Sequence, residues 1–341
     1  MGLRSPRIGL CNEASGFGKG SRMNTRTVTI FGGAGFVGRN TVRALAKTGW
    51  RIRVACRRPH MAFFLKPLGA VGQIAPVKCD IIDADQVSAA VQGSDAVINL
   101  VGIAYGNFED AHVTGADNIA QAAAKAGAKA LVHVSAIGAD TESHSRYAQT
   151  KAEGEKRVRA AFPTATILRP SIIFGADDSF FNRFAGMARM LPALPLIGGG
   201  KTRFQPVFVG NVAAAIATAL DSDAARGRTF ELGGPTIYTF RELMQIVLRE
   251  TGRKRALIPL PFAIASVKAF FLQLLPNPLL TPDQVTLLKS DNVVSPTAAG
   301  LSELGITPNT VEAEVPFYLW RFRAKGEYAR LGDVDGETAA P

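Results

Sequence analysis

The stretch TVTIFGGAGFVG (27–38) decides the fold that this sequence encodes. Its first five residues alternate β-branched and apolar side chains, which favours a strand, and a glycine-rich turn follows. The early glycines permit a tight turn and a close approach of the backbone to a pyrophosphate, whereas the last permits close packing of the next helix. The free amide groups at the start of that helix then face the phosphates. The residues expected to form this dinucleotide site are Gly32, Gly35, Phe36, Val37 and Gly38.

Short apolar runs alternate with helical patterns on both sides of this turn. A helix through about Lys47 follows the glycines, and an alanine-rich helix at 116–128 ends near Gly127. Strands that alternate with helices predict βαβ units and a parallel sheet, so we expect an α/β protein with a Rossmann-like, doubly wound sheet. The further strands expected in this sheet are RIRVAC (51–56), IAPVKCD (74–80), AVINLVG (96–102), ALVHVSA (130–136) and ATILRP (165–170).

The composition changes after Pro170, which predicts a smaller, discontinuous C-terminal domain. VFVGNVAAAIATAL (207–220) has the pattern of a strand that turns into a helix, and RTFELGG (228–234) that of a returning strand. We assign 24–178 plus 207–234 to the nucleotide domain, and 179–206 plus 235–325 to the small domain that meets a substrate or partner. Residues 1–23 are expected to be an extension outside the fold, either a transit peptide or the product of an upstream start codon, and 326–341 a tail.

The end of the second expected strand indicates which nucleotide binds. Dinucleotide folds usually place an acid there for the ribose 2′-hydroxyl, but RIRVACRRPH (51–60) contains none. Arg57 and Arg58 stand in its place, and a guanidinium suits a 2′-phosphate through bidentate hydrogen bonds. We therefore predict NADP(H), with NAD(H) as the weaker alternative. Asp80 closes the third strand, where it could bond the adenine amino group or serve only as a cap.

A second pattern lies in SRYAQTKAEGE (145–155), where Tyr147 and Lys151 stand four residues apart. At this spacing both side chains project from one face of a helix, one turn apart. Of the five tyrosines, only Tyr147 has a lysine at that distance. The pattern fits a proton donor with a neighbouring cation, and it also fits a solvated helix surface.

With LRPSIIFG (168–175), the glycine turn and the Tyr147–Lys151 pair resemble the short-chain dehydrogenase/reductase superfamily in its extended or atypical branch. The resemblance covers roughly 24–325. Within it, VTIFGGAGFVGRNTVRALAKTGW (28–50), SRYAQTKAEGE and LLKSDNVVS (287–295) are most similar to one subgroup. That subgroup is the nucleotide-binding accessory subunit of respiratory complex I and its bacterial relatives, for which the family implies a structural nucleotide.

The superfamily resemblance implies roles for the residues at matching positions. Tyr147 would be the acid/base of hydride transfer, and Lys151 would bond the nicotinamide ribose and lower the pKa of the tyrosine below its ordinary value of about 10. Ser135 would hold the substrate oxygen, completing a catalytic Ser135, Tyr147 and Lys151 set. Asn99 and Pro170 would lie beside the cofactor. Asn211 stands where many extended enzymes carry aspartate, which weakens a sugar-nucleotide interpretation.

Composition limits the possible partners. The net charge of +11 favours anionic cofactors, an acidic membrane surface or an acidic protein neighbour. Neither the cysteines nor the histidines have metal-ligand spacing, and no nucleic-acid motif is present, so we expect neither a metal nor a nucleic acid. For the apolar stretch AIASVKAFFLQLL (263–275) we favour a buried helix of the small domain. The other interpretation is a surface that docks on a membrane or partner.

Three functions remain open from these observations. The first is an NADP(H)-binding accessory or assembly subunit of complex I at the peripheral arm. The second is a stand-alone oxidoreductase or epimerase that acts on an apolar, quinone-like or nucleotide-linked substrate, so the sequence leaves open whether the protein is an enzyme. The third is a redox sensor that reports NADP(H) occupancy to a partner. We expect the protein in the cytoplasm, peripheral on the cytoplasmic face of the inner membrane, with the mitochondrial matrix side as the alternative.

Overall fold

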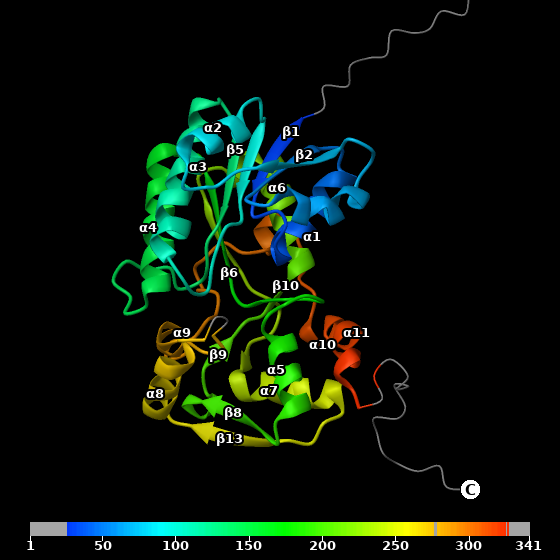
Figure 1. Ribbon diagram of the computed structural model, residues 1–341, viewed down its shortest axis with the longest axis vertical. Helices are drawn as coiled ribbons and strands as arrows, with labels where there is room; N and C mark the ends of the chain where they lie inside the picture. The colour runs from blue at the N-terminus through cyan, green and yellow to red at the C-terminus, as the bar shows by residue number, and fades with distance from the viewer. Residues whose placement is uncertain (1–25, 276–277, 325, 327–341) are drawn as a thin grey trace, which may run out of the picture.

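The computed structural model describes residues 26–275, 278–324 and 326, which form two lobes (Figure 1). The larger lobe is built on a seven-stranded sheet in the order β11-β6-β5-β4-β1-β2-β3. All of its strand pairs are parallel, and the strand order reverses between β1 and β4. The predicted Rossmann-like, doubly wound parallel sheet is confirmed. Its strands are β1 (Thr27–Phe31), β2 (Arg51–Cys56), β3 (Ile74–Lys78), β4 (Ala96–Asn99), β5 (Ala130–Val134), β6 (Thr166–Pro170) and β11 (Thr229–Leu232).

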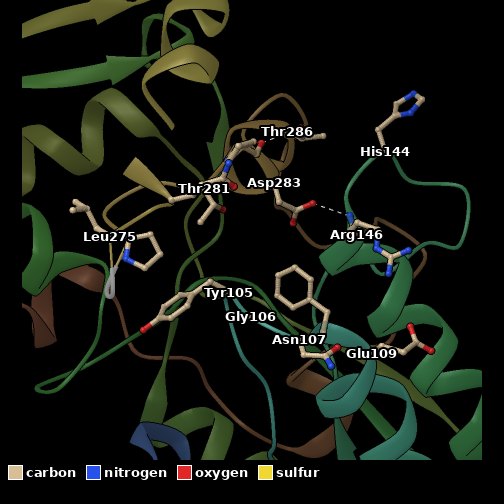
Figure 2. Close-up of a pocket in the computed structure, with 14 residues that line it drawn as sticks. Tyr105, Gly106, Asn107, Glu109, His144, Arg146, Leu275, Thr281, Asp283 and Thr286 are labelled. Atoms are coloured by element: carbon tan, nitrogen blue, oxygen red, sulfur yellow. Dashed lines mark hydrogen bonds between the residues drawn. The ribbon is translucent and has the colours of Figure 1, made fainter. Parts of the chain in front are cut away.

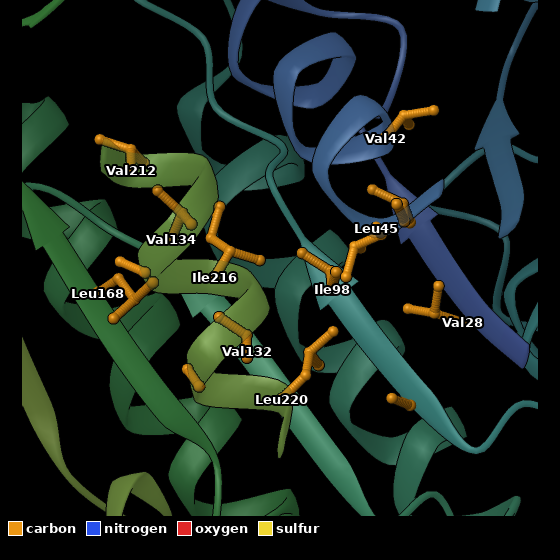
Figure 3. Close-up of a cluster of buried hydrophobic side chains, with 14 of the residues drawn as sticks. Val28, Val42, Leu45, Ile98, Val132, Val134, Leu168, Val212, Ile216 and Leu220 are labelled. Carbon is orange, nitrogen blue, oxygen red and sulfur yellow. The ribbon is translucent and has the colours of Figure 1, made fainter. Parts of the chain in front are cut away.

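Helices cover both faces of this sheet. On one face α1 (Phe36–Lys47) and α6 (Val209–Asp221) pack side by side over the strands, and Figure 3 shows their apolar side chains meeting those of β1, β4, β5 and β6. On the other face lie α2 (Ala84–Val91), α3 (Gly115–Lys125) and α4 (Arg146–Ala161), which bury a second apolar cluster. The irregular helical segments of this lobe include a 3₁₀ segment η1 (Pro59–Leu68) and a π-helical turn η2 (Glu109–Thr114).

The smaller lobe has a core of its own beneath the carboxyl ends of the strands (Figure 1). The apolar stretch after residue 179 enters this core through Phe181, Ala185, Leu194 and Leu196, which are all fully buried. Its helices are α5 (Phe181–Met190), α7 (Phe240–Thr251), α8 (Phe262–Leu272), α9 (Pro282–Leu287), α10 (Val311–Glu314) and α11 (Pro316–Leu319). Its short strand pairs are β7 (Ile173–Phe174) with β10 (Val207–Phe208), β9 (Arg203–Phe204) with β12 (Tyr238–Thr239), and β8 (Ala193–Ile197) with β13 (Ala256–Leu260).

The segment after residue 310 closes the small lobe rather than standing apart from it. Val311, Val315 and Leu319 lie in the core, and the Tyr318 hydroxyl donates a hydrogen bond of 2.7 Å to Asp178. Burial and that carboxylate both raise the pKa of Tyr318. The predicted extension at 1–23 and the tail beyond residue 326 lie outside the described residues.

The helix α8 corrects one expectation. We predicted a buried helix at 263–275, but only Ala265 and Ala269 of α8 are buried. The prediction is wrong because apolar residues surround the whole helix, while the lobe covers only one narrow stripe of it. None of the described helices has the length and apolar character needed to span a bilayer. The exposed apolar side chains on and after α8 are Ile264, Val267, Phe270, Phe271, Leu274, Leu275 and Leu279.

Candidate functional site

The glycine turn lies where the strand order reverses, between the carboxyl ends of β1 and β4. Gly32 has φ +78°, and a Cβ there would lie 3.0 Å from the backbone of Leu100, which follows β4. A Cβ on Gly38 would lie 2.3 Å from the carbonyl oxygen of Gly32, so only glycine lets α1 approach the turn. Phe36 and Val37 open α1 immediately after Gly35, and the first turn of that helix contains no acid. This backbone cradle fits a pyrophosphate, whose charge the helix N-terminus stabilises.

The two arginines after β2 stand at the same edge of the sheet as this turn. The Arg57 and Arg58 side chains are exposed, and among the described residues neither guanidinium has a hydrogen-bond or ion-pair partner. Asp80 follows β3 and accepts a hydrogen bond of 3.3 Å from the amide of Ile82. Both guanidinium groups are therefore available to an anionic ligand, whereas one Asp80 oxygen already stabilises its own turn.

Tyr147 lies in the first turn of α4, and an acid from the other lobe caps this helix. The carboxylate of Asp283, in α9, accepts hydrogen bonds from the Ser145 hydroxyl at 2.8 Å and from the amides of Arg146 at 2.7 Å and Tyr147 at 3.3 Å. An acid at this place satisfies free amides and stabilises the positive end of the helix dipole. Burial, and then the charge of Asp283, raise the pKa of Tyr147 to about 12.

This result differs from the expectation that Lys151 lowers the pKa of the tyrosine. Lys151 is buried, and its Nζ donates a hydrogen bond of 3.1 Å to the carbonyl oxygen of Val134 at the end of β5. Burial lowers the pKa of Lys151 to about 8, against a smaller opposing effect of Glu155. No described residue hydrogen-bonds the Tyr147 hydroxyl, so that group is available to a ligand.

His112, in η2, is one of the aromatic side chains that pack around Tyr147. Its Nε2 accepts from the amide of Ile103 at 3.1 Å, so its Nδ1 carries the proton and donates to the Thr150 hydroxyl at 3.0 Å. The ring stacks on Phe108 with centroids 5.4 Å apart and meets the edge of Tyr147 at 5.3 Å. Burial, and then the charge of Lys151, lower the pKa of His112 to about 3. The imidazole is therefore neutral and positions α4.

Two further predicted residues lie at the carboxyl ends of β4 and β5. Ser135 follows β5, and its hydroxyl is buried without a partner among the described residues. Asn99 is buried, and its amide group bonds the His133 ring at 3.1 Å and the amide of Val101 at 3.0 Å. The Asn99 side chain is thus occupied within the protein. The Ser135 hydroxyl, in contrast, has no hydrogen-bond partner among the described residues, and the oxygen of a ligand could supply one.

Pro170 ends β6 and is buried, and its carbonyl oxygen accepts from the amide of Ile137 at 3.0 Å. The next residue, Ser171, ties this edge to the small lobe because its hydroxyl bonds the Asn292 side chain at 2.7 Å. Asn292 lies in the LLKSDNVVS stretch, which is paired with Phe204. This stretch therefore joins the two lobes beside the predicted nicotinamide end of the site. Asn211 bonds Asn309 at 3.0 Å and stays buried inside the protein.

A slot of about 730 Å³ opens between the lobes next to α4 (Figure 2). Tyr105 lies on one side of the slot and Thr281, Asp283 and Thr286 lie on the opposite side, and Phe108 also lines it. Phe108 also meets the ring of Tyr147, with centroids 5.9 Å apart, so the slot lies one ring away from the predicted acid/base. The remaining residues that line the slot are Gly106, Asn107, Glu109, His144, Arg146, Gln273, Leu275, Pro278 and Pro282.

The sequence reasoning missed Asp283 and His112. The TPDQ stretch at 281–284 has the pattern of a capping box, which the structure confirms, but that signal announces only the start of α9. Nothing in it indicates that Asp283 caps a second helix in the other lobe. His112 stands in FEDAHVTG (108–115) without a metal-ligand spacing, so its contact with Thr150 had no signal in the sequence. The described residues contain no cluster of His, Cys, Asp or Glu that could hold a metal.

Comparison with known proteins agrees with this geometry. Residues 28–233 match the NAD dependent epimerase/dehydratase family. Among solved structures, the dTDP-glucose 4,6-dehydratase DesIV of Streptomyces venezuelae superimposes with a TM-score of 0.68 at 20% identity, over 87% of this chain and 96% of that chain. At that identity the likeness supports the fold alone.

Three relatives illustrate the range of similar sequences. The mitochondrial protein NADH dehydrogenase (ubiquinone) 1 alpha subcomplex subunit 9 is 36% identical in Arabidopsis thaliana, over 91% of this chain and 81% of that protein. The mouse protein of the same name is 36% identical, over 90% of this chain and 83% of its own length. Ceramide reductase of Caulobacter vibrioides is 33% identical, over 69% of this chain and 73% of that protein. The chain therefore belongs to the NAD dependent epimerase/dehydratase family of extended short-chain dehydrogenases/reductases, in the group that is similar to complex I accessory subunits.

Proposed function

We propose that the protein is an NADP(H)-binding accessory or assembly subunit of respiratory complex I. The observation that carries this proposal is the 36% identity, over nine tenths of this chain, to subunits named for NADH dehydrogenase (ubiquinone) in a plant and a mammal. The similarity extends through the small lobe, beyond the family match that ends at residue 233.

The nucleotide we assign is NADP(H), held as a structural cofactor. The glycine turn would hold the pyrophosphate, Arg57 and Arg58 the 2′-phosphate, and Lys151 with Tyr147 the nicotinamide ribose. When bound, the nicotinamide supplies hydride chemistry. A general acid or base works best with a pKa near the operating pH, whereas the pKa of Tyr147 is about 12. At that pKa the tyrosine remains protonated, so its hydroxyl can donate a hydrogen bond to the ribose.

The exposed face of α8 supports a position of the protein at a membrane surface. Phe270 and Phe271 are 57% and 64% exposed, and a monomeric soluble protein rarely presents such adjacent aromatic side chains without a partner. Residues 251–282 contain Arg253, Lys254, Arg255 and Lys268 but no acid. Apolar side chains together with basic ones suit the interface of an anionic bilayer. We assign the protein to the peripheral arm, beside the membrane, on the cytoplasmic or the matrix side according to the organism.

Gentle solubilisation of native membranes tests this function. The extract is separated on a native gel and stained for NADH dehydrogenase activity, and the bands are probed for this chain. We expect the chain in the active band, with NADP(H) released when that band is denatured. Migration only at the size of a monomer or dimer would contradict the assignment to complex I.

A second function is favoured by the free hydroxyl of Ser135. This buried group, which has no hydrogen-bond partner among the described residues, forms together with the Tyr147 hydroxyl the site of a reductase for an alkyl-chain carbonyl compound. The ceramide reductase relative supports a substrate of that class. A Tyr147→Phe variant separates the two functions, because a structural subunit would keep its nucleotide and its place in complex I. Loss of cellular function in a Tyr147→Phe protein that still binds nucleotide would support the reductase.

A further inference from the structure

Three arginines gather at the carboxyl end of α5, in the small lobe. Arg189 lies in the last turn of α5, and Arg253 and Arg255 lie in the loop between α7 and β13. The Nε of Arg255 donates a hydrogen bond of 2.9 Å to the carbonyl oxygen of Ala188, the residue before Arg189. The Nε of Arg253 donates one of 3.0 Å to the carbonyl oxygen of Phe322, which packs against α5. Both loop arginines are thereby fixed beside the end of α5.

These bonds occupy only a few of the donors that the three side chains carry. A guanidinium has five N–H donors. Among the described residues, Arg253 uses only its Nε, and Arg255 uses its Nε and an Nη1 bond of 3.2 Å to the carbonyl oxygen of Lys254. Arg189 is exposed and has no hydrogen-bond or ion-pair partner within the same part of the chain. Capping of carbonyl groups therefore positions Arg253 and Arg255 but leaves most of their donors available.

The charges that act on this cluster are positive. Burial, and then the like charges of Arg255 and Arg189, lower the pKa of Arg253. The nearest acid along the chain, Glu250, has its carboxylate in an ion pair of 2.8 Å with Arg249. Like charges held close together repel one another, and a bound anion relieves the repulsion. Neighbouring guanidinium groups suit a phosphate in particular, because its oxygens accept several charge-assisted hydrogen bonds.

Exposed apolar side chains flank the cluster at the end of the molecule that contains α8. Met190 and Leu191 follow Arg189, and Ile258 stands in β13 shortly after Arg255; all three apolar side chains are exposed. The strand β13 pairs with β8 along the lower end of the small lobe and leads into α8 (Figure 1). An anion bound by the arginines would therefore have apolar neighbours, as a lipid phosphate has at the surface of a bilayer.

We propose that Arg189, Arg253 and Arg255 bind the terminal phosphate of an anionic lipid headgroup in the membrane that α8 contacts. A terminal phosphate presents three acceptor oxygens and a charge of about −1.5 to −2 at neutral pH, which suits three cations better than the single charge of a phosphodiester. The inference rests on the proposed function for the membrane contact. It adds a site that selects among the lipids of that membrane.

Co-sedimentation of the full chain with vesicles tests this site. The vesicles consist of phosphatidylcholine with either phosphatidic acid, which has a terminal phosphate, or phosphatidylglycerol, which has a phosphodiester, and both kinds are adjusted to equal surface charge. We expect the wild type to bind tighter to the vesicles that contain phosphatidic acid. The full chain is used, so the acidic residues of the 326–341 tail are present in every measurement.

Arg189→Gln is the informative variant, because this arginine forms no bond with the described residues that the substitution would break. It should weaken binding to phosphatidic acid vesicles about tenfold, since charge-assisted hydrogen bonds are lost, and should remove the preference for them. Lys254→Gln is the matched control. It removes the same charge from an exposed side chain between Arg253 and Arg255, and it should retain the preference. Circular dichroism checks that both variants fold.

Equal binding of the wild type to both kinds of vesicle, or equal losses in Arg189→Gln and Lys254→Gln, would overturn the proposal. Titration with soluble glycerol 1-phosphate separates the two sources of a phosphate. Binding of this compound without any preference for phosphatidic acid vesicles would replace the lipid site by a site for free phosphate. Since the assay contains no complex I, failure of this site and failure of the proposed subunit role give separate results.

Discussion

The Asp283 carboxylate lies 2.8 Å from the Ser145 hydroxyl, and this contact ties the small lobe to the start of the helix that contains Tyr147. The two residues are 138 positions apart in the chain. The same carboxylate caps α4 and raises the pKa of Tyr147. The protonation of the tyrosine therefore depends on how the two lobes fit together.

Replacing Asp283 by asparagine should change stability and the tyrosine together. The loss of a charged cap should lower the free energy of unfolding by about 1–2 kcal/mol, measured by urea denaturation. The pKa of Tyr147 should also fall from its value of about 12, because the carboxylate raises it. Absorbance titration of tyrosinate in this variant and in Tyr147→Phe isolates that change. Asp223→Asn is the control, since Asp223 forms an exposed ion pair with Arg226 and should change stability by less than about 1 kcal/mol.

The arginines after β2 should distinguish NADPH from NADH. Arg57→Ala combined with Arg58→Ala should weaken NADPH binding about tenfold to a hundredfold and leave NADH binding nearly unchanged, because only NADPH carries the 2′-phosphate. Isothermal titration of both nucleotides measures the difference. Arg51→Ala removes an exposed arginine at the opposite end of β2 and should affect neither. Equal losses for both nucleotides in the double variant would contradict the assignment of these arginines to the 2′-phosphate.

Acid should destabilise the protein through its buried histidines. Burial, and then the charges of Lys151 and His112, lower the pKa of His133 from 6.5 to about 3. The unfolded chain therefore binds a proton between about pH 6.5 and 3 that the folded protein excludes, and the free energy of unfolding falls as the pH falls through this window. The slope is at most about 1.4 kcal/mol per pH unit for each such histidine.

A His133→Gln variant cannot titrate and should show a shallower pH dependence by about one proton in urea denaturation between pH 6 and 4. His144→Gln serves as the control because that side chain is exposed, and it should retain the wild-type slope. A wild-type slope in His133→Gln would mean that His133 is not protonated on unfolding in this window.

The aromatic pair of α8 should govern binding to membranes. Phe270→Ser combined with Phe271→Ser should reduce co-sedimentation with vesicles that contain anionic lipid at least tenfold, since two large apolar side chains no longer enter the interface. Added salt should also weaken the binding of the wild-type protein to these vesicles, because it screens the attraction between basic side chains and anionic lipid. Phe317→Ser changes a phenylalanine that is 78% exposed elsewhere on the small lobe, and it should bind like the wild type. Equal binding by all three proteins would show that α8 is not the membrane face.

The sequence by itself determined the parts of this protein that depend on local geometry. TVTIFGGAGFVG contains, within 12 residues, a strand, a glycine with positive φ (Gly32) and a glycine where a Cβ would not fit (Gly38). The residue types alone therefore predicted the strand, the turn and the helix. The alternation of such units then predicted the parallel sheet. The sequence likewise predicted that Tyr147 and Lys151 share one helix face, because the two residues are four positions apart.

Only the tertiary structure decided the properties that depend on burial and on distant partners. The sequence of α8 is apolar all round, and the number of neighbours that cover it, not its composition, left Phe270 and Phe271 exposed. The pKa of Tyr147 rose instead of falling because it is set by desolvation and by Asp283, which lies 136 residues away. Desolvation and charge act through space, so residues that are remote in sequence determine the chemistry of this site.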